Sequence, residues 1–285
     1  MTEGARPETF LSGRVGYVGP RRSVPLRAAD RLLDRLAGLR RLPHRLDRMA
    51  AAVPGRRVLA LCVYRPDSDR ARLLPAALRT DRHALELAFG AMGEPLAELR
   101  ESTYVSGLRG GKFQNLNAVL GAAGIDPGEF DWTLVVDDDV LLPERFTDRM
   151  LGVCEALELA LAQPAQTLAS HAAWTVTRRR PFALARRTEF VEIGPLFAMR
   201  RDVAPELAPF PELRFGWCLD LHWAALAREY GWRLGVVDAL PVRHDLAGVA
   251  SGYRHADAVE EASGFLAERP YLTAAEANRT LAVHR

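Results

Sequence analysis

The chain has almost no lysine, few cysteines and no long hydrophobic run. Lys112 is the only lysine among 285 residues, so the positive charge is carried by arginine. The cysteines, Cys62, Cys154 and Cys218, lie far apart without a CxxC pair, which excludes the common zinc-ligand spacings and favours reduced packing residues. Because no apolar run reaches about 18 residues and no signal-peptide core is present, we expect a cytoplasmic protein.

Composition indicates one large globular domain with extensions. Apolar residues make up 48% of the chain, which is enough to bury one sizeable core. The formal net charge is only +2, so the sequence offers no case for nucleic acid as a partner. We divide the chain into a basic N-terminal arm over 1–56, a central domain over 57–250 and a helical tail over 251–285.

The N-terminal arm carries leucines and arginines at helical spacing. Residues 1–25 lack periodicity and predict an extended segment, whereas 26–49 predict amphipathic helices that divide at Pro43. A basic amphipathic helix can lie on an anionic membrane surface, so peripheral membrane contact is one hypothesis. We favour the alternative, packing of the leucines on the core, because no aromatic anchors accompany them.

Strand and helix patterns alternate along the central domain. This alternation is typical of an α/β protein with a mostly parallel sheet covered by helices. The predicted strands span 57–64, 83–89, 132–139, 166–176, 189–199 and 234–237. The predicted helices span 71–78, 113–120, 145–162 and 217–230, with two polar helices from residue 256 onwards.

Three consecutive carboxylates follow the most apolar strand. Trp132–Val136 predicts a buried strand, and Asp137–Asp139 come directly after it. In α/β sheets the ligand-binding residues lie at the carboxyl ends of strands. Crowded acids repel one another unless a cation compensates, and Mg²⁺ or Mn²⁺ with a phosphorylated substrate would do so. A solvated turn or a helix N-cap before Pro143-Glu144 is the alternative.

A glycine-rich loop, Gly107–Lys112, opens a predicted helix. The backbone donors of Gly110 and Gly111, together with the Lys112 ammonium, could hold diphosphate oxygens. The loop does not fit the P-loop pattern, because the lysine is not followed by Ser or Thr, and an ordinary flexible turn explains it at least as well. Asn115 would hydrogen-bond a substrate or face solvent.

Asp220 lies among aromatic residues at the start of a predicted helix. Burial there would raise its pKa and its basicity, and such a carboxylate can deprotonate an acceptor hydroxyl. Trp217 and Trp223 could stack on a sugar ring through their apolar faces. The alternative is a capping or ion-paired Asp220, with both tryptophans in the core.

Four more polar residues are candidates. His244 follows a predicted strand and could supply a nitrogen ligand to a metal, or be a surface histidine. Glu189 and Glu192 would lie on opposite faces of a strand, or one of them would enter the site if the strand bulges. His171 has no partner visible in the sequence.

Taken in order, these segments resemble a nucleotide-sugar-dependent glycosyltransferase of the GT-A fold, similar to glycosyltransferase family 2. Asp137–Asp139 resembles the DxD motif of that superfamily. The later segments are similar to the DUF707 group of proposed glycosyltransferases, in Phe190–Ile193, Phe215–Asp220, Val236–Asp238 and Val242–His244. The resemblance covers about residues 57–247 and implies a GT-A sheet flanked by helices. The helical N-terminal extension, predicted from the spacing of its leucines, lies outside the resemblance.

The resemblance also implies roles for particular residues. Asp137, Asp139 and His244 would hold Mn²⁺ or Mg²⁺ against the donor diphosphate, and Asp220 would be the catalytic base. The donor would also contact Tyr64, Arg65, Gly110, Gly111, Lys112, Asn115, Asp137 and Asp138. The acceptor would contact Glu192, Trp217 and Trp223.

Two positions depart from the family 2 pattern. The end of the second predicted strand, Leu87–Gly90, has no acid to read the nucleobase, so the base stays open although a UDP-sugar is favoured. Leu219 stands where a second acid commonly precedes the catalytic base.

We therefore expect a metal-dependent glycosyltransferase of the hexosyltransferase type, which moves a sugar onto an acceptor hydroxyl with inversion. Nucleotidyl transfer is one alternative, because it needs a similar sheet, metal and nucleotide. A noncatalytic sugar- or nucleotide-binding module is the other. The sequence does not identify the acceptor.

Overall fold

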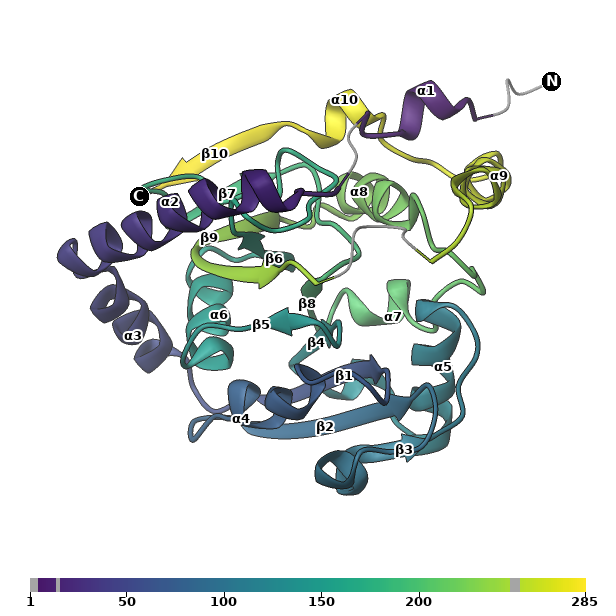
Figure 1. Cartoon of the computed structure of the whole chain (residues 1–285), viewed down its shortest axis with the longest axis horizontal. Coiled ribbons are helices and arrows are strands. Elements are labelled where there is room, and N and C mark those ends of the chain that lie inside the picture. Colours follow the sequence, from purple (N-terminus) through teal and green to yellow (C-terminus); the bar gives the residue numbers. More distant parts are fainter. Residues whose placement is uncertain (1–4, 14–15, 247–251) are drawn as a thin grey trace.

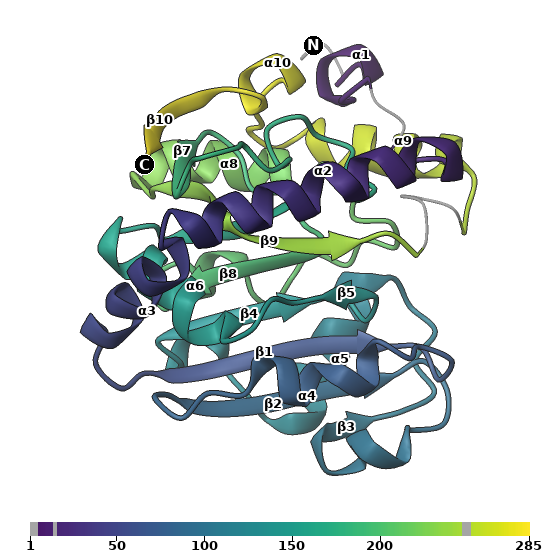
Figure 2. The same cartoon turned by 60° about the vertical axis from the view of Figure 1, so that its left-hand side comes forward.

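A single sheet organises the chain. The structure is a computed structural model that describes residues 5–13, 16–246 and 252–285. The strand order in the sheet is β10-β7-β9-β6-β8-β4-β1-β2-β3, and the short β5 pairs with β9 (Figures 1 and 2). The strands are β1 (Arg57–Tyr64), β2 (Ala84–Ala91), β3 (Thr103–Val105), β4 (Trp132–Val136), β5 (Val140–Leu141), β6 (Leu161–Gln166), β7 (Ala185–Thr188), β8 (Leu196–Arg200), β9 (Leu234–His244) and β10 (Thr280–His284).

Helices cover both faces of the sheet. They are α1 (Pro7–Phe10), α2 (Pro20–Leu39), α3 (Leu42–Ala52), α4 (Leu74–Leu78), α5 (Lys112–Ala123), α6 (Phe146–Ala156), α7 (Ala204–Leu207), α8 (Leu219–Tyr230), α9 (His255–Leu266) and α10 (Ala274–Ala277). Single 3₁₀ turns lie at Ala71–Leu73, Ala97–Ser102 and Pro127–Glu129. Within the described ranges, no helix is long and apolar enough to cross a bilayer.

The predicted α/β fold with a mostly parallel sheet and flanking helices is confirmed. Strands β3, β2, β1 and β4 form a parallel block, and β6 and β9 form a second parallel pair. The antiparallel β8 joins the block to this pair, and the antiparallel β7 and β10 extend the sheet beyond β9. The carboxyl ends of β1 and β4 therefore meet at one edge, where α/β sheets bind ligands.

Side-chain alternation along β1 divides the core into two clusters. Leu59 and Leu61 point to the face covered by α5 and α8, whereas Val58 and Ala60 point to the face covered by α3, α4 and α6. All four side chains are fully buried. Full burial of one Val or Leu side chain contributes about 1.5–3 kcal/mol, so this central strand fixes both layers of helices.

The predicted helix over 145–162 is too long. Helix α6 ends at Ala156, Glu158 adopts a left-handed φ of 54°, and the chain continues as the buried strand β6. Alternation of Leu and Ala does not distinguish a buried strand from a helix, which explains the error. The strand predicted over 166–176 is also wrong, because the strand closes at Gln166 and the chain continues through turns and irregular structure. The strand predicted over 189–199 begins only at Leu196.

Both ends of the chain also differ from the predictions. Residues 1–25 were expected to be extended, yet α1 forms at Pro7–Phe10 and α2 begins at Pro20. The tail contains α9 and α10 as predicted, but Thr280–His284 adds the edge strand β10 to β7. The domain boundary predicted at residue 250 lies outside the described residues.

Helix α2 is held on the body of the protein by a buried carboxylate. Asp30 is 7% exposed and accepts backbone hydrogen bonds from Leu168 and Ala169, at 3.0 and 3.1 Å. Arg179 lies 3.3 Å from the same carboxylate. Figure 2 shows α2 crossing in front of β9. The predicted division of the basic helices is confirmed, and it falls at Arg40-Arg41, just before Pro43.

Candidate functional site

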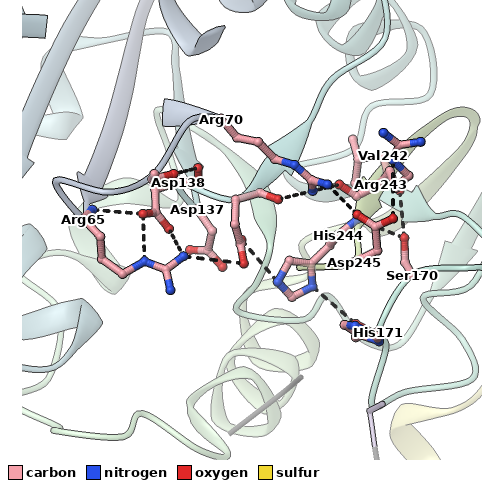
Figure 3. Close-up of polar contacts among 12 residues, drawn as sticks. Arg65, Arg70, Asp137, Asp138, Ser170, His171, Val242, Arg243, His244 and Asp245 are labelled. Carbon is pink, nitrogen blue, oxygen red and sulfur yellow. Dashed lines mark hydrogen bonds and ion pairs between the residues drawn. The ribbon is translucent and has the colours of Figure 1, made fainter. Parts of the chain in front are cut away.

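The three aspartates occupy the turn between β4 and β5. Strand β5 pairs antiparallel with the end of β9, and Val140 lies opposite His244 in the register. This pairing carries an imidazole from late in the chain to the carboxylates at the end of β4 (Figure 3). The three side chains then turn to three different partners.

Asp139 is paired with His244. Nε2 of His244 lies 3.3 Å from Oδ1 of Asp139, and Nδ1 of the same ring lies 3.3 Å from the carbonyl oxygen of His171. Burial disfavours the charged form of each group, but the ion pair prevails. The pKa of Asp139 therefore lies below its ordinary value and the pKa of His244 above it.

Asp137 is paired with the only lysine. Nζ of Lys112 lies 2.6 Å from Oδ1 of Asp137 and donates to the carbonyl oxygen of Ile193, also at 2.6 Å. Burial raises the pKa of Asp137, and the Lys112 charge opposes that rise. A Cβ at Gly194 would lie 2.9 Å from Oδ2 of Asp137, so the glycine leaves room for this carboxylate.

Asp138 is paired with Arg65 and ties β4 to β1, and Nη2 of the same guanidinium lies 3.8 Å from Oδ2 of Asp139. Asp138 accepts three hydrogen bonds from Arg65, from the backbone N–H at 2.9 Å, from Nε at 3.0 Å and from Nη2 at 3.1 Å. Ser68 donates to its carbonyl oxygen at 2.7 Å. The predicted donor contacts of Asp138 and Arg65 would thus have to form around an existing bidentate ion pair.

The glycine-rich loop is shaped by its own side chains. Asn115 accepts from the backbone N–H of Gly110 and donates to its carbonyl oxygen, both at 2.9 Å. Asn115 was predicted to contact the substrate, but in the structure its side-chain amide is used to hold the backbone of the loop. Gly111 caps α5, and a Cβ there would lie 1.9 Å from the carbonyl oxygen of Arg214. Only glycine allows this close approach.

The side chains at the end of β4 provide part of a ligand set for a divalent metal. A carboxylate oxygen and an imidazole nitrogen, from Asp139 and His244, already face one another, and this donor set suits Mn²⁺. Over residues 5–13, 16–246 and 252–285, no group of three His, Cys, Asp or Glu side chains is already arranged around a metal-sized point. Asp137 would complete the set, and its Oδ1 is paired with Lys112 in this structure.

A cavity of about 510 Å³ begins at these residues and extends to α8. Its lining brings together side chains that the sequence named separately: Lys112, Asp137, Glu192, Trp217, Asp220 and His244. The volume falls in the range of small-molecule sites, about 300–1,000 Å³. One cavity therefore joins the proposed metal and phosphate end to the proposed base.

Two buried carboxylates lie in this cavity. Burial, with the nearby Asp220 charge, raises the pKa of Glu192 to about 8. Burial raises the pKa of Asp220 to about 7, although hydrogen bonds from the backbone of Ile193 and Leu221 oppose the shift. Gln166 donates to Oε2 of Glu192 at 2.8 Å. At neutral pH, Asp220 is the more ionised of the two carboxyls, so it is the one more often able to accept a proton.

A strained loop directs Asp220 into the cavity. Gly216 and Cys218 both adopt left-handed φ values, of 71° and 67°, immediately before α8. Glu261 on α9 holds the loop by accepting backbone hydrogen bonds from Arg214, Phe215 and Gly216, at 2.7, 2.9 and 3.0 Å. A non-glycine residue with positive φ is uncommon, and such strain gathers at functional sites.

The two tryptophans that were predicted to contact the acceptor lie in different environments. Trp217 lines the cavity, and its Nε1 donates to the hydroxyl of Tyr253 at 2.8 Å. Trp223 is 1% exposed and packs against Phe113 and Phe197, with ring centroids at 5.9 and 5.0 Å. The predicted acceptor contact of Trp223 is therefore wrong, because α8 turns this side chain into the core.

Tyr64 is also in the core rather than at the predicted nucleotide site. Its side chain is fully buried, on the β1 face that packs on α3, α4 and α6. The hydroxyl lies 2.9 Å from Oγ1 of Thr103 and accepts from the backbone N–H of Leu96 at 3.2 Å. No part of the ring is left to contact a nucleobase.

Several cavity residues were missed by the sequence analysis. Gln166 and Trp174 come from the chain after β6, and Phe10 and Leu11 come from the N-terminal arm. His171 also lines the cavity and accepts the backbone N–H of Val18 at 2.9 Å through Nδ1. No local pattern marks these residues, since only the tertiary fold brings them to α8.

Comparisons with known proteins give similarities of fold. No protein-family model matches the chain, and no curated protein matches it. Solved structures with a similar fold include GalNAc-T7 with UDP, GalNAc and Mn²⁺, at 12% identity and a TM-score of 0.47, over 70% of this chain and 44% of that one. This chain thus spans less than half the length of GalNAc-T7.

Two further solved structures are similar over more of their length. The mannosyltransferase PcManGT from Pyrobaculum calidifontis with GDP-Man and Mn²⁺ has 15% identity and a TM-score of 0.47, over 82% of this chain and 68% of that one. S. aureus TarS 1–349 with UDP-GlcNAc has 12% identity and a TM-score of 0.49, over 75% of this chain and 68% of that one. None of these similarities assigns a role to a residue of this chain.

Proposed function

We propose that this protein is a GT-A glycosyltransferase that moves a sugar from a nucleotide-sugar donor to an acceptor hydroxyl. One observation carries the proposal. A single cavity is lined by the cationic Lys112, by His244, which is our candidate metal ligand, and by the buried carboxylate Asp220. These groups match the two needs of glycosyl transfer, a stabilised leaving diphosphate and a deprotonated acceptor.

The donor diphosphate would lie between the β4 turn and the start of α5. Lys112 is the first residue of α5, where the helix dipole adds to the charge of its ammonium group. Asp139, His244 and Asp137 would hold Mn²⁺, or Mg²⁺ with less help from the imidazole. When bound, such an ion neutralises charge that grows on the leaving diphosphate. We favour a UDP-sugar as the donor.

Asp220 would act as the base. It takes the proton of the acceptor hydroxyl, whose oxygen forms a bond to the anomeric carbon. The bond from that carbon to the diphosphate oxygen breaks, and its electron pair leaves with the nucleoside diphosphate. We propose that the transfer inverts the anomeric configuration, with the acceptor hydroxyl at Asp220 attacking opposite to a leaving group held by Lys112; both side chains line the cavity.

A panel of sugar nucleotides tests this function. Each is added with Mn²⁺, and the melting temperature and the release of nucleoside diphosphate are measured. A donor at 100 times its Kd adds about 2.7 kcal/mol to the free energy of unfolding, so binding is visible as a thermal shift. If no sugar nucleotide shifts the melting temperature with metal present, the donor assignment is wrong.

Two rival functions give different results. A nucleotidyltransferase would release pyrophosphate from a nucleoside triphosphate rather than nucleoside diphosphate from a sugar nucleotide. A noncatalytic binding module would bind a sugar nucleotide without turnover, and Asp220→Asn would leave its activity in cells unchanged. The glycosyltransferase predicts that Asp220→Asn keeps donor binding but lowers turnover by about 10²–10⁴-fold.

We also propose that α2 can bring the protein to an anionic membrane surface. Its solvent face exposes Arg31 and Arg35 beside Leu32, which is 57% exposed. Such a face suits acidic headgroups. Sedimentation with phosphatidylserine vesicles should exceed that with phosphatidylcholine vesicles, and Arg31→Gln with Arg35→Gln should remove the difference. Equal sedimentation by the two vesicle types would contradict membrane contact.

A further inference from the structure

The half of the cavity next to Asp220 is walled by apolar and aromatic side chains. They come from the N-terminal arm, the chain after β6, the loop before β8, the loop before α8, and α9. They are Phe10, Leu11, Trp174, Ile193, Trp217 and Val259. Segments far apart in the sequence thus converge on one apolar chamber, which we call the acceptor chamber.

Contacts with neighbouring aromatic residues fix the orientation of the two tryptophans of the chamber. Trp174 is 6% exposed and packs on Phe190, with ring centroids 4.5 Å apart. Trp217 is fixed by its hydrogen bond to Tyr253 and by an edge contact with His255 at 5.5 Å. Fixed aromatic walls favour flat apolar ligands, because stacking adds about 0.5–1.5 kcal/mol beyond the burial of area.

The charge of the chamber disfavours anions. Its buried ionisable groups include two carboxylates, Glu192 and Asp220, which are 8% and 5% exposed. Among the described residues that line the cavity there is no arginine, and the charge of the Lys112 ammonium, which donates to the carbonyl oxygen of Ile193, is neutralised by its ion pair with Asp137. An anionic ligand buried beside the two carboxylates would be poorly solvated, and the ionised form of Asp220 would repel it.

The chamber is equally unsuited to a sugar acceptor. A disaccharide carries many hydroxyls, and each one buried without a partner costs about 1–3 kcal/mol. Apart from the proposed metal and phosphate residues, the polar side chains that line the cavity are Ser12, Gln166, His171, His255 and the two carboxylates, which are fewer than the hydroxyls of a disaccharide. A ligand with one hydroxyl near Asp220 and an apolar body satisfies both the acids and the walls.

We propose that the acceptor is an uncharged aromatic hydroxyl compound, a phenol or fused-ring alcohol, whose ring lies between Trp217 and Trp174 and whose hydroxyl meets Asp220. This inference rests on the proposed glycosyl transfer. The aryl oxygen forms the new bond to the anomeric carbon, its proton passes to Asp220, and the nucleoside diphosphate departs with the electron pair of the broken bond.

Three probes test the ligand class in equilibrium dialysis against the full chain. 2-Naphthol is the neutral aromatic hydroxyl compound, 6-hydroxy-2-naphthoate adds only a carboxylate, and cellobiose is a neutral sugar. We expect 2-naphthol to bind at least about tenfold more tightly than either of the others. Equal or tighter binding of the naphthoate or of cellobiose would overturn the proposal.

Two tryptophan variants locate the binding. Trp217→Ala removes a wall of the chamber and should weaken 2-naphthol binding by about tenfold or more. Trp232→Ala is the matched control, since this ring stacks on Tyr230 at 5.0 Å, beyond the far end of α8. Both variants are checked by thermal melting. If Trp232→Ala weakens binding as much as Trp217→Ala does, the acceptor chamber is not the binding site.

Turnover separates this inference from the proposed function. With a sugar nucleotide and Mn²⁺, 2-naphthol should increase the release of nucleoside diphosphate and yield a naphthyl glycoside. Binding of 2-naphthol with no turnover of any sugar nucleotide would leave the ligand class standing and refute the glycosyl transfer. Turnover stimulated by cellobiose and not by 2-naphthol would keep the transferase and refute the aromatic acceptor.

Discussion

Nε2 of His244 lies 3.3 Å from Oδ1 of Asp139, across the antiparallel pairing of β5 with the end of β9. The two-residue strand β5 is what turns the chain back from β4 so that the pair can form. The backbone N–H of His244 is held as well, since it donates to Oγ of Ser170 at 3.0 Å. The imidazole is thus fixed in position before any ion binds.

His244→Ala should therefore lose most of the thermal shift that Mn²⁺ adds in the presence of a sugar nucleotide. The variant would lose the imidazole nitrogen as a ligand of the ion. Loss of a residue that only hydrogen-bonds to a ligand already lowers metal affinity by about 10–100-fold, so loss of the ligand itself should have at least that effect. The melting temperature is measured with and without Mn²⁺. His44→Ala, at an exposed position on α3, should keep the full shift. An unchanged shift in His244→Ala would remove His244 from the metal site.

Glu192→Gln should stabilise the protein at alkaline pH. Because the folded pKa of Glu192 is raised to about 8, the folded state holds a proton that the unfolded state has lost, so the free energy of unfolding falls as pH rises towards 8. Glutamine is neutral at every pH and removes this loss. One pKa unit corresponds to about 1.36 kcal/mol. At roughly pH 8.5, the free energy of unfolding of Glu192→Gln should therefore exceed that of the wild type by on the order of a few kcal/mol.

The measurement is denaturant unfolding of both proteins at acid and alkaline pH. Below about pH 4 the wild-type carboxyl is protonated in both the folded and the unfolded states, so the variant and the wild type should agree there. Glu94→Gln, at an exposed position, serves as the control and should change little at either pH. A Glu192→Gln variant that is no more stable than wild type at alkaline pH would contradict the burial of a raised-pKa acid there.

The acid-tipped strand could be predicted because its signal is local. Five apolar residues followed by Asp137–Asp139 mark a buried strand and its carboxyl end within ten positions. Asp220 was recognisable for a similar reason, since aromatic neighbours in the sequence implied burial. Both predictions depended on residues adjacent in the chain, and the structure places both groups in one cavity.

The remainder of the site depended on packing that no local pattern contains. Tyr64 ends a strand that is covered on both faces, and alternation alone does not say which face meets the cavity. Trp217 and Trp223 looked equivalent, but α8 begins at Leu219 and turns only the second into the core. Phe10 reaches the cavity from an arm that was assigned outside the domain.

Activity should rise with pH as Asp220 ionises. Burial raises the pKa of this carboxyl to about 7, so kcat/KM should increase through neutral pH with an apparent pKa near that value, since only the ionised form accepts the acceptor proton. Asp220→Asn should lose this limb of the profile along with the activity, while its thermal shift with donor and Mn²⁺ persists. An Asp220→Asn variant with the wild-type profile would show that another group is the base.

Gly111→Ala should destabilise the protein and disturb the donor loop. A Cβ there would lie 1.9 Å from the carbonyl oxygen of Arg214, a backbone atom in the loop that leads to Asp220. Relief of such a clash requires backbone movement, which typically costs about 1–3 kcal/mol. Gly121→Ala is the matched control on the same helix, since nothing lies within 4 Å of its Cβ. At this control position, alanine should add about 0.4–1 kcal/mol. Chemical denaturation of both variants measures the difference, and equal stabilities would mean that the glycine loop does not touch the loop before α8.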